Sequence, residues 1–285
     1  MTVRFTKHHG LGNDFLVLLD PAGDAALTPA QVVRLCDRRR GIGADGVLRA
    51  TRPAVEAAGE PVAAMELFNA DGSRAEMSGN GIRCLAQALL RAGWATPPEV
   101  MIATDAGVRT VSLRRAVDPV TDVLAVDMGT PRLGDEAPEW TGGPLRRAAW
   151  ADLGNPHLVI EADAEARVEG EPAGRPAFTA ADLVMLGEKV NASVPTGANV
   201  HVIVAGADAG SLTMRPYERG VGPTAACGTG ACAAAAVAHR WGLVGDRVEV
   251  RMPGGTAEVV LGPTVQLVGP ATFVAVVETE PAAWR

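Results

Sequence analysis

Cysteine and lysine are both scarce in this sequence. The four cysteines are spaced neither as a disulfide framework nor as a zinc site, and are typical of reduced thiols in a cytoplasmic protein: Cys36, Cys84, Cys227 and Cys232. The two lysines are Lys7 and Lys189. A Schiff-base enzyme needs a buried lysine, and neither has a setting that suggests one, so pyridoxal phosphate is not expected as a cofactor.

Long apolar runs are also missing. No stretch approaches the ~18 consecutive apolar residues of a membrane helix, and the first residues lack the apolar segment of a secretion signal. The net charge of −7 argues against a nucleic-acid partner. With 285 residues, 47% hydrophobic and 21% charged, the chain is typical of a globular protein of one large or two medium domains. We expect a cytoplasmic protein with a small-molecule partner; the oligomeric state is open, a homodimer being one alternative.

The stretch from Glu218 to Cys232 carries the strongest local signal. Cys227 stands directly before Gly228-Thr-Gly230, and an Ala-rich run follows to His239. Ala favours helix, so Cys227 is predicted at a helix N-terminus, where free N–H groups bind anions and the dipole favours a thiolate. The alternative is a small buried residue that merely opens a core helix.

A second stretch repeats this pattern. Ser78-Gly-Asn-Gly81 also precedes an apolar run, and Asn69 and Glu218 stand equally far before Ser78 and Cys227. Leu11-Gly-Asn-Asp-Phe-Leu-Val is matched by Leu153-Gly-Asn-Pro-His-Leu-Val. Three motif pairs in the same order indicate two related halves. We place the change of halves at Asp118-Pro119, giving 1–119 and 120–272, with the last strand, 273–285, free to rejoin the first half.

Local signals predict helices and strands in both halves. Thr28-Pro-Ala-Gln31 is a capping box that predicts a helix to about Arg38, and Thr179 is predicted to cap a helix to about Lys189. Gly41-Ile-Gly-Ala-Asp-Gly46 spells a dinucleotide fingerprint, but a helix precedes it and a strand follows, so nucleotide binding is not expected. Glu165 to Pro176 is predicted to be the loosest stretch.

Taken together, the motifs resemble the diaminopimelate epimerase family over nearly the whole chain. The resemblance rests on eight stretches in order: Gly12–Phe15, Gly41–Asp45, Asn69–Ser73, Gly79–Gly81, Gly154–His157, Asn199–Val200, Glu218–Gly222 and Cys227–Gly230. It implies an α/β (α+β) fold of two pseudo-symmetric halves, each a barrel-like, mostly antiparallel sheet around a central helix. It also implies an active site in the cleft between the halves, no cofactor and no metal.

The resemblance assigns catalytic roles to specific residues. The family uses two cysteines on opposite sides of the substrate α-carbon, and Cys227 matches the second. Ser78 stands where the first is expected, and Cys84 is inside the helix and cannot take its place. His157 and Glu218 resemble residues that tune the cysteine pKa, and Glu218 also suits the α-ammonium group.

The substrate contacts implied by the resemblance lie in both halves. Two helix N-termini, at Gly79-Asn80 and Gly228-Thr229, suit the reacting carboxylate. The distal carboxylate and amine are assigned to Asn69, Asn155, Asn199 and Arg219, and a further contact to Asn13. Gly46 stands where the family often has Gln, so no contact is assigned there.

Ser78 leaves three alternatives to a diaminopimelate epimerase. These are a racemase or epimerase of another amino acid, an isomerase resembling the phenazine type, which lacks the paired thiols, and an amino-acid-binding homologue with impaired catalysis.

Overall fold

The computed structural model describes residues 2–53, 59–163 and 178–284. Within these residues the chain divides into two compact units, Met1–Asp127 with Val268–Arg285, and Met128–Leu267. The loose stretch expected at Glu165 to Pro176 lies outside the described residues. No helix in the described part of the chain is long and apolar enough to cross a membrane.

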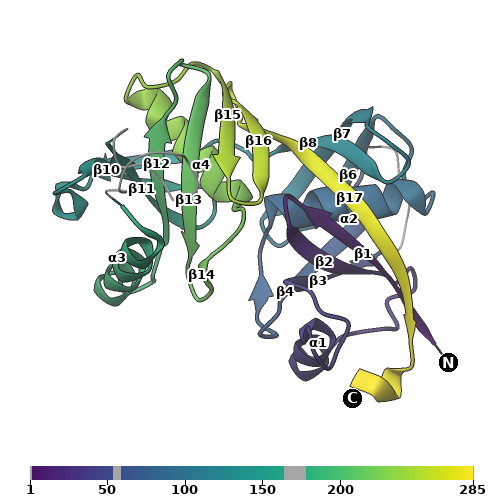
Figure 1. Cartoon of the computed structure of the whole chain (residues 1–285). Helices are drawn as coiled ribbons and strands as arrows, with labels where there is room; N and C mark the ends of the chain where they lie inside the picture. The colour runs from purple at the N-terminus through teal and green to yellow at the C-terminus, as the bar shows by residue number, and fades with distance from the viewer. Residues whose placement is uncertain (1, 54–58, 164–177, 285) are drawn as a thin grey trace. The chain divides into compact units, whose positions relative to one another are not determined.

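The first unit is a closed barrel around a helix (Figure 1). Its elements are β1 (Val3–Gly10), β2 (Asn13–Leu19), α1 (Pro29–Cys36), β3 (Gly46–Thr51), β4 (Ala63–Asn69), β5 (Arg74–Ala75), α2 (Gly79–Arg91), β6 (Glu99–Thr104), β7 (Gly107–Ala116), β8 (Thr121–Asp127) and most of β17 (Gln266–Thr279), followed by the short 3₁₀ turn Pro281–Trp284. Strand pairing runs β17–β1–β2–β3–β4–β6–β7–β8 and returns to β17. A closed ring leaves its main strands no free edge, and α2 fills the interior.

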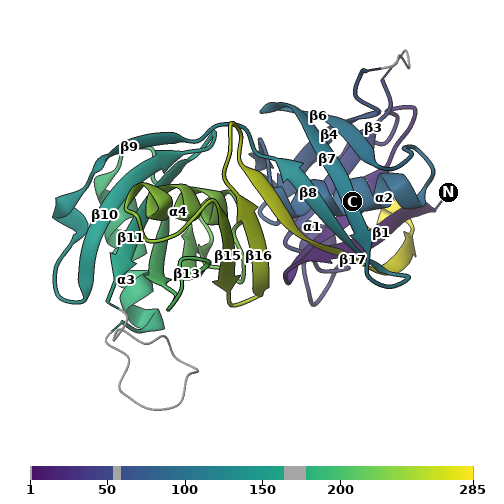
Figure 2. The same ribbon diagram turned by 90° about the horizontal axis from the view of Figure 1, so that it is seen from above.

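The second unit repeats this order of elements. It contains β9 (Arg132–Glu136), a 3₁₀ turn (Pro138–Trp140), β10 (Leu145–Asp152), β11 (Pro156–Ala162), α3 (Ala180–Ser193), β12 (Asn199–Ala205), β13 (Ser211–Glu218), β14 (Gly222–Pro223), α4 (Gly228–Arg240), β15 (Arg247–Met252) and β16 (Gly255–Val260). Each unit starts with an antiparallel hairpin, β1–β2 or β10–β11, and an outer helix then leads to a strand parallel to the second hairpin strand, β3 or β12. An antiparallel strand follows, β4 or β13, and the central helix leads to a strand parallel to it, β6 or β15. The predicted pseudo-symmetry is therefore confirmed, and Figure 2 shows α4 against the strands of its unit.

The two central helices are buried for different reasons. Every residue of α4 from Gly228 to Ala238 is buried, because a helix that is apolar all round and made largely of Ala can pack against strands on every side. Helix α2 also buries Arg83 and Gln87, whose polar ends bond to backbone carbonyl groups, including those of Pro270 and Ala271 on β17. The C-terminal strand thus satisfies polar groups of α2 and belongs with the first unit.

The division between the units lies later than the sequence indicated. Asp118 and Pro119 form the turn between β7 and β8, where the Asp118 carboxylate accepts hydrogen bonds from the N–H groups of Val120 and Thr121 at 2.8 and 2.7 Å. Strand β8 pairs with β7 and β17, so the chain leaves the first unit only after Asp127.

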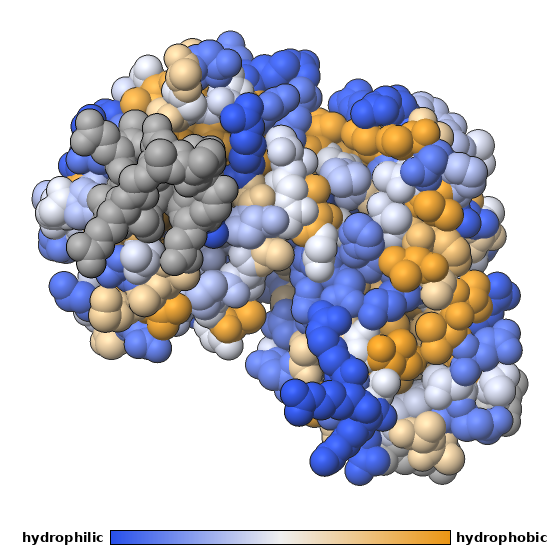
Figure 3. Space-filling model, viewed as in Figure 1, coloured by the Kyte–Doolittle hydropathy of each residue, from blue (hydrophilic) through white to orange (hydrophobic). Residues whose placement is uncertain are grey.

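Strand β17 exposes two valine side chains. Val274 and Val276 are 52% and 43% exposed, and Figure 3 shows hydrophobic surface gathered over this strand. Strand β17 thus packs its inner face on α2 while its outer face keeps apolar side chains in contact with solvent.

Candidate functional site

Ser78 and Cys227 occupy the same position in the two units. Each is the N-cap of its central helix, with extended backbone angles of φ −139°, ψ 123° at Ser78 and φ −128°, ψ 111° at Cys227. The first N–H groups of a helix have no partner within the helix, so both positions place donors and the positive end of a helix dipole beside a reactive side chain. The sequence predicted both helix starts correctly.

The Ser78 hydroxyl caps its helix. Its Oγ accepts a hydrogen bond from the N–H of Gly81 at 3.0 Å, and the residue is half-buried. A Cβ added at Gly81 would lie 3.1 Å from the Ser78 Cβ, so Gly81 gives the cap room. This bond uses one of the two acceptor lone pairs of the serine oxygen, and the hydroxyl proton can still be donated.

The Cys227 thiol is buried and lies against the first turn of its own helix. It is 4% exposed, and its Sγ lies 3.6 Å from the Thr229 Oγ1. Burial, followed by the negative charge of Glu218, raises the pKa of Cys227 well above its usual value, although bonds from Thr229 and the Gly230 backbone act the other way. The lowered pKa expected from the helix N-terminus is therefore wrong for this structure, because burial outweighs the dipole, and Cys227 is a thiol at neutral pH.

This electrostatic arrangement predicts how Cys227 reacts. In the wild type, its alkylation by iodoacetamide should still be accelerating at about pH 9, because only the thiolate attacks. Glu218→Gln should lower the Cys227 pKa and speed alkylation several-fold at fixed pH, measured by peptide mass spectrometry. Glu249→Gln, which removes an exposed carboxylate on β15, is the matched control. Equal rates in the wild type and Glu218→Gln would contradict the role of the carboxylate.

A chain of hydrogen bonds orients the amides of the first unit. The Arg83 guanidinium donates to the Asn80 Oδ1 at 2.6 Å, the Asn80 Nδ2 donates to the Asn13 Oδ1 at 3.3 Å, and the Asn13 Nδ2 donates to Asp45 at 2.9 Å. Asn80 and Arg83 are 2% and 0% exposed. Because each amide oxygen is engaged by a donor, both amides are held in one orientation. Asn13 and Asn80 thus form one cluster with Arg83, which also donates to the Gly79 carbonyl at 3.0 Å.

Charged residues that the sequence did not single out hold this cluster in place. Arg38 bridges Asp14 and Asp45 at 2.6 and 2.7 Å, and Lys7 lies 2.8 Å from Asp14. Hydrogen bonds from Arg38 and Lys7 lower the pKa of Asp14 even though burial, the largest single influence, raises it. Asp14 and Asp45 stand in two of the sequence motifs, and this position could have identified them as part of the site. Lys7 and Arg38 lie outside the motifs, so no pattern in the sequence marked them.

Asn69 is the last residue of β4 and opens the turn that follows it. Its Nδ2 donates to the Ser73 Oγ at 3.0 Å, and its backbone N–H donates to the Ser73 carbonyl at 2.9 Å. Asn69 thus helps to form this turn, a common role for Asn. Its partner by symmetry, Glu218, lies at the end of β13, where the Thr224 hydroxyl donates to its Oε1 at 2.6 Å.

Two histidines are paired inside the second unit. The His157 Nδ1 lies 2.9 Å from the His201 Nε2, and the His157 Nε2 lies 2.8 Å from the Asn155 Oδ1. Burial, followed by the charge of Arg219, lowers the pKa of His157 to about 3, and burial lowers the pKa of His201 well below its usual value. Both rings are therefore neutral at neutral pH. The sequence identified Asn155 and His157 but missed His201.

Asn199 and Arg219 are joined at the edge of the same unit. The Asn199 Oδ1 accepts the backbone N–H of Arg219 at 2.9 Å, and the exposed Arg219 side chain donates to the Thr196 carbonyl at 2.7 Å. The structure thus groups Asn155 with His157, Asn199 with Arg219, and Cys227 with Thr229 and Glu218. In the first unit it groups Asn13 with Asn80, next to Gly79 and Ser78, while Asn69 bonds to Ser73 and pairs with Gly46, the residue after Asp45.

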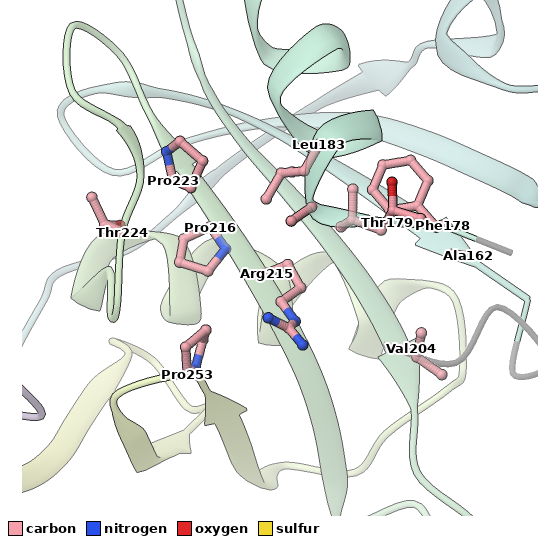
Figure 4. A pocket seen from close by; sticks show the side chains of 12 residues that line it. Ala162, Phe178, Thr179, Leu183, Val204, Arg215, Pro216, Pro223, Thr224 and Pro253 are labelled. Carbon is pink, nitrogen blue, oxygen red and sulfur yellow. The ribbon is translucent and has the colours of Figure 1, made fainter. Parts of the chain in front are cut away.

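A separate pocket in the second unit contains none of the predicted site residues. Figure 4 shows it beside the start of α3, with Thr179 and Leu183 on one side and Arg215 and Pro253 on another. Its lining is mostly apolar and includes Thr224, which bonds to Glu218. In the described part of the chain, no three His, Cys, Asp or Glu side chains are grouped so as to hold a metal ion.

Comparison with known proteins gives a consistent result. The model of a family described as diaminopimelate epimerase matches residues 5–134 and 149–274. A diaminopimelate epimerase from Mycolicibacterium paratuberculosis is 41% identical, with 99% of each chain covered. Another, from Thermobifida fusca, is 40% identical, with 96% of each chain covered.

Solved structures of similar fold are more distant in sequence. A hydroxyproline epimerase from Agrobacterium vitis has a TM-score of 0.69 at 17% identity, covering 99% of this chain and 94% of that one. A phenazine biosynthesis protein of the PhzF family from Bacillus anthracis has a TM-score of 0.69 at 16% identity, covering 98% and 99%. At these identities the likeness shows the fold alone.

Proposed function

The chain belongs to the diaminopimelate epimerase family, and on that premise we propose that it interconverts LL- and meso-2,6-diaminopimelate without a cofactor. The observation that carries the proposal is the placement of Cys227, a buried thiol at the N-terminus of the central helix of its unit. The reaction is one of amino-acid biosynthesis, leading to lysine, and we place it in the cytoplasm.

The chemistry requires strong stabilisation of negative charge. An amino-acid α-proton is a very weak acid, and its removal leaves a carbanion whose charge spreads into the carboxylate. The first-turn N–H groups at Gly79-Asn80 and Gly228-Thr229 are donors that suit this carboxylate. The carboxylate of Glu218 suits the α-ammonium group, and a cation bound there would also lower the pKa of Cys227 toward the working range.

Cys227 is the residue that exchanges a proton with the α-carbon. As a thiol it gives its proton to the carbanion, which forms the Cα–H bond and leaves a thiolate; in the reverse direction the thiolate removes that proton. Ser78 is assigned the opposite face of the α-carbon. A serine hydroxyl is a far weaker acid than a thiol, so a proton transfer through Ser78 is slow and limits net epimerisation.

The remaining residues select the substrate. The bidentate guanidinium of Arg219 suits the distal carboxylate, and Asn69, Asn155 and Asn199 suit the distal carboxylate and amine. Asn13 contributes a further polar contact to the substrate, and its side chain is held in place by Asn80, which is held in turn by Arg83. A substrate that lacks a carboxylate at its distal end leaves Arg219 unpaired and is expected to react poorly.

A second candidate function is favoured by Ser78. With serine in place of the first cysteine, the chain would bind a diamino dicarboxylic acid and exchange its α-proton from one side, with little net epimerisation. This candidate keeps the substrate class and loses most of the turnover.

Deuterium exchange tests the chemistry that both candidates share, and the rate of net epimerisation measured beside it separates them. In deuterated water the enzyme should exchange the α-proton mainly from the epimer whose proton faces Cys227, faster than it interconverts the epimers, as measured by NMR. Exchange should survive dialysis and chelation but not alkylation of Cys227. Binding without any exchange would contradict the proposed epimerase chemistry, and exchange that needs added metal or pyridoxal phosphate would contradict the cofactor-free mechanism.

A further inference from the structure

His201 is a buried titratable residue that the proposed chemistry leaves unused. It lies on β12, next to β11, which carries His157, and both rings are 0% exposed. The two ring centroids are 5.1 Å apart and the planes are inclined by 33°. Since His157 pairs with Asn199 in the parallel register and His201 lies two positions beyond Asn199, both side chains point to the same face of the sheet.

The His201 ring also contacts the helix that Cys227 opens. A Cβ added at Gly230 would lie 2.3 Å from the His201 Cε1 and 2.5 Å from its Nε2. Any side chain at position 230 would therefore displace this ring. His201 is wedged between the first turn of α4 and His157, and its position is closely determined.

Hydrogen-bonding capacity determines where the protons lie. One proton lies between the His157 Nδ1 and the His201 Nε2, and the His201 Nδ1 has no hydrogen-bond partner among the described residues. If His201 donates from Nε2, its Nδ1 is an unpaired acceptor; if His201 accepts at Nε2, its Nδ1 carries an unpaired, buried N–H. A buried N–H without a partner is the rarer and costlier defect, so His201 donates.

The orientation of Asn155 follows from this assignment. A neutral His157 that accepts at Nδ1 carries its proton on Nε2 and donates to the Asn155 Oδ1 at 2.8 Å. With its oxygen engaged, Asn155 turns its amide NH₂ group away from the histidines. In the opposite arrangement the amide would be flipped and its oxygen would face outward instead.

We propose that His201 is a positioning residue: it fixes the His157 tautomer and thereby makes Asn155 present hydrogen-bond donors, suited to a carboxylate oxygen, to the substrate. This rests on the proposed function for the identity of the ligand, but the tautomer itself does not depend on it. Burial supports the arrangement, because it keeps each imidazole neutral. Each ring then carries one proton, and only the proton of His201 lies in the bond between the two rings.

The tautomer can be tested without substrate. A long-range ¹H–¹⁵N NMR spectrum of the wild type should show His157 protonated at Nε2 and bare at Nδ1. In His201→Phe, which keeps a ring but removes both nitrogens, His157 should lose this single tautomer. His201→Gln, which can place an amide N–H near the lost Nε2, should restore it. A wild-type spectrum with the His157 proton on Nδ1 would overturn the proposal, even if His201→Phe failed to fold.

The consequence for binding is tested separately. His201→Phe should raise KM for diaminopimelate about tenfold, the effect of one lost hydrogen bond, with a smaller change in kcat. His8→Phe is the matched control, since His8 is a buried histidine of the other unit that bonds Gln87 and Thr6. An unchanged KM in His201→Phe would refute the positioning role. Absence of all turnover in the wild type would count against the proposed function alone and leave the NMR result standing.

Discussion

Ser78→Cys is expected to raise the turnover of diaminopimelate by roughly 100-fold or more, the range that a well-matched general acid or base contributes. A thiol has a pKa near 8.5, whereas a serine hydroxyl is far less acidic and needs an activating base. In this structure the Ser78 oxygen is already engaged by the N–H of Gly81 at 3.0 Å.

The same substitution should cost stability. Serine is a good N-cap and cysteine a poorer one, so Ser78→Cys should lower the free energy of unfolding by about 1 kcal/mol. Cys227 shows that a cysteine fits the equivalent N-cap position. Higher turnover in a less stable variant would separate a catalytic gain from any general improvement of the fold.

The measurement is a side-by-side assay of epimerisation and of deuterium exchange in the wild type and Ser78→Cys. Ser112→Cys, on β7 of the same unit, introduces a thiol away from the proposed site and is the control. Substrate affinity should change little, because Ser and Cys have similar shapes and the amides of Gly79 and Asn80 are untouched. Equal turnover in wild type and Ser78→Cys would show that Ser78 is itself a competent catalytic residue and would favour a different, serine-using mechanism.

Arg219→Ala is expected to lower kcat/KM by about 30-fold, or ~2 kcal/mol. Truncating one partner of a buried charge pair costs ~2–5 kcal/mol, and the lower end applies because the guanidinium is exposed in the structure and an exposed pair is screened. Its present bond, to the Thr196 carbonyl, is to a neutral acceptor and leaves other N–H groups for a carboxylate.

Arg219→Lys tests the geometry of this contact. Lysine keeps the charge and loses the planar fork, so it should recover only part of the lost kcat/KM. Arg251→Ala removes an exposed arginine of the same unit and should leave kcat/KM unchanged. If Arg219→Ala retains wild-type kcat/KM, or if lysine reacts as well as diaminopimelate in the wild type, Arg219 does not bind the distal carboxylate.

Local signals were sufficient for most elements near the proposed site. The Gly-headed apolar runs predicted α2 and α4, and both begin where the Gly-x-Gly motifs stand. The capping boxes at Thr28 and Thr179 are present, although α1 ends at Cys36 and α3 continues to Ser193. Caps depend on contacts within a few residues, so they can be recognised from neighbours in the sequence. The C-terminal end of a helix depends on the residues that its last turn packs against, and these can be distant in the sequence.

The sequence by itself determined the family, the duplicated order of elements and the two N-cap positions, because each of these rests on residue types at short, ordered spacings. Only the tertiary structure decided the protonation state of Cys227, since its raised pKa comes from burial by distant strands and from Glu218, which opposes the helix dipole. The partners of Asn13 and His157 were decided in the same way. Asp45, which Arg38 also binds, accepts from Asn13, and His201 bonds to His157; no short-range pattern in the chain records such contacts.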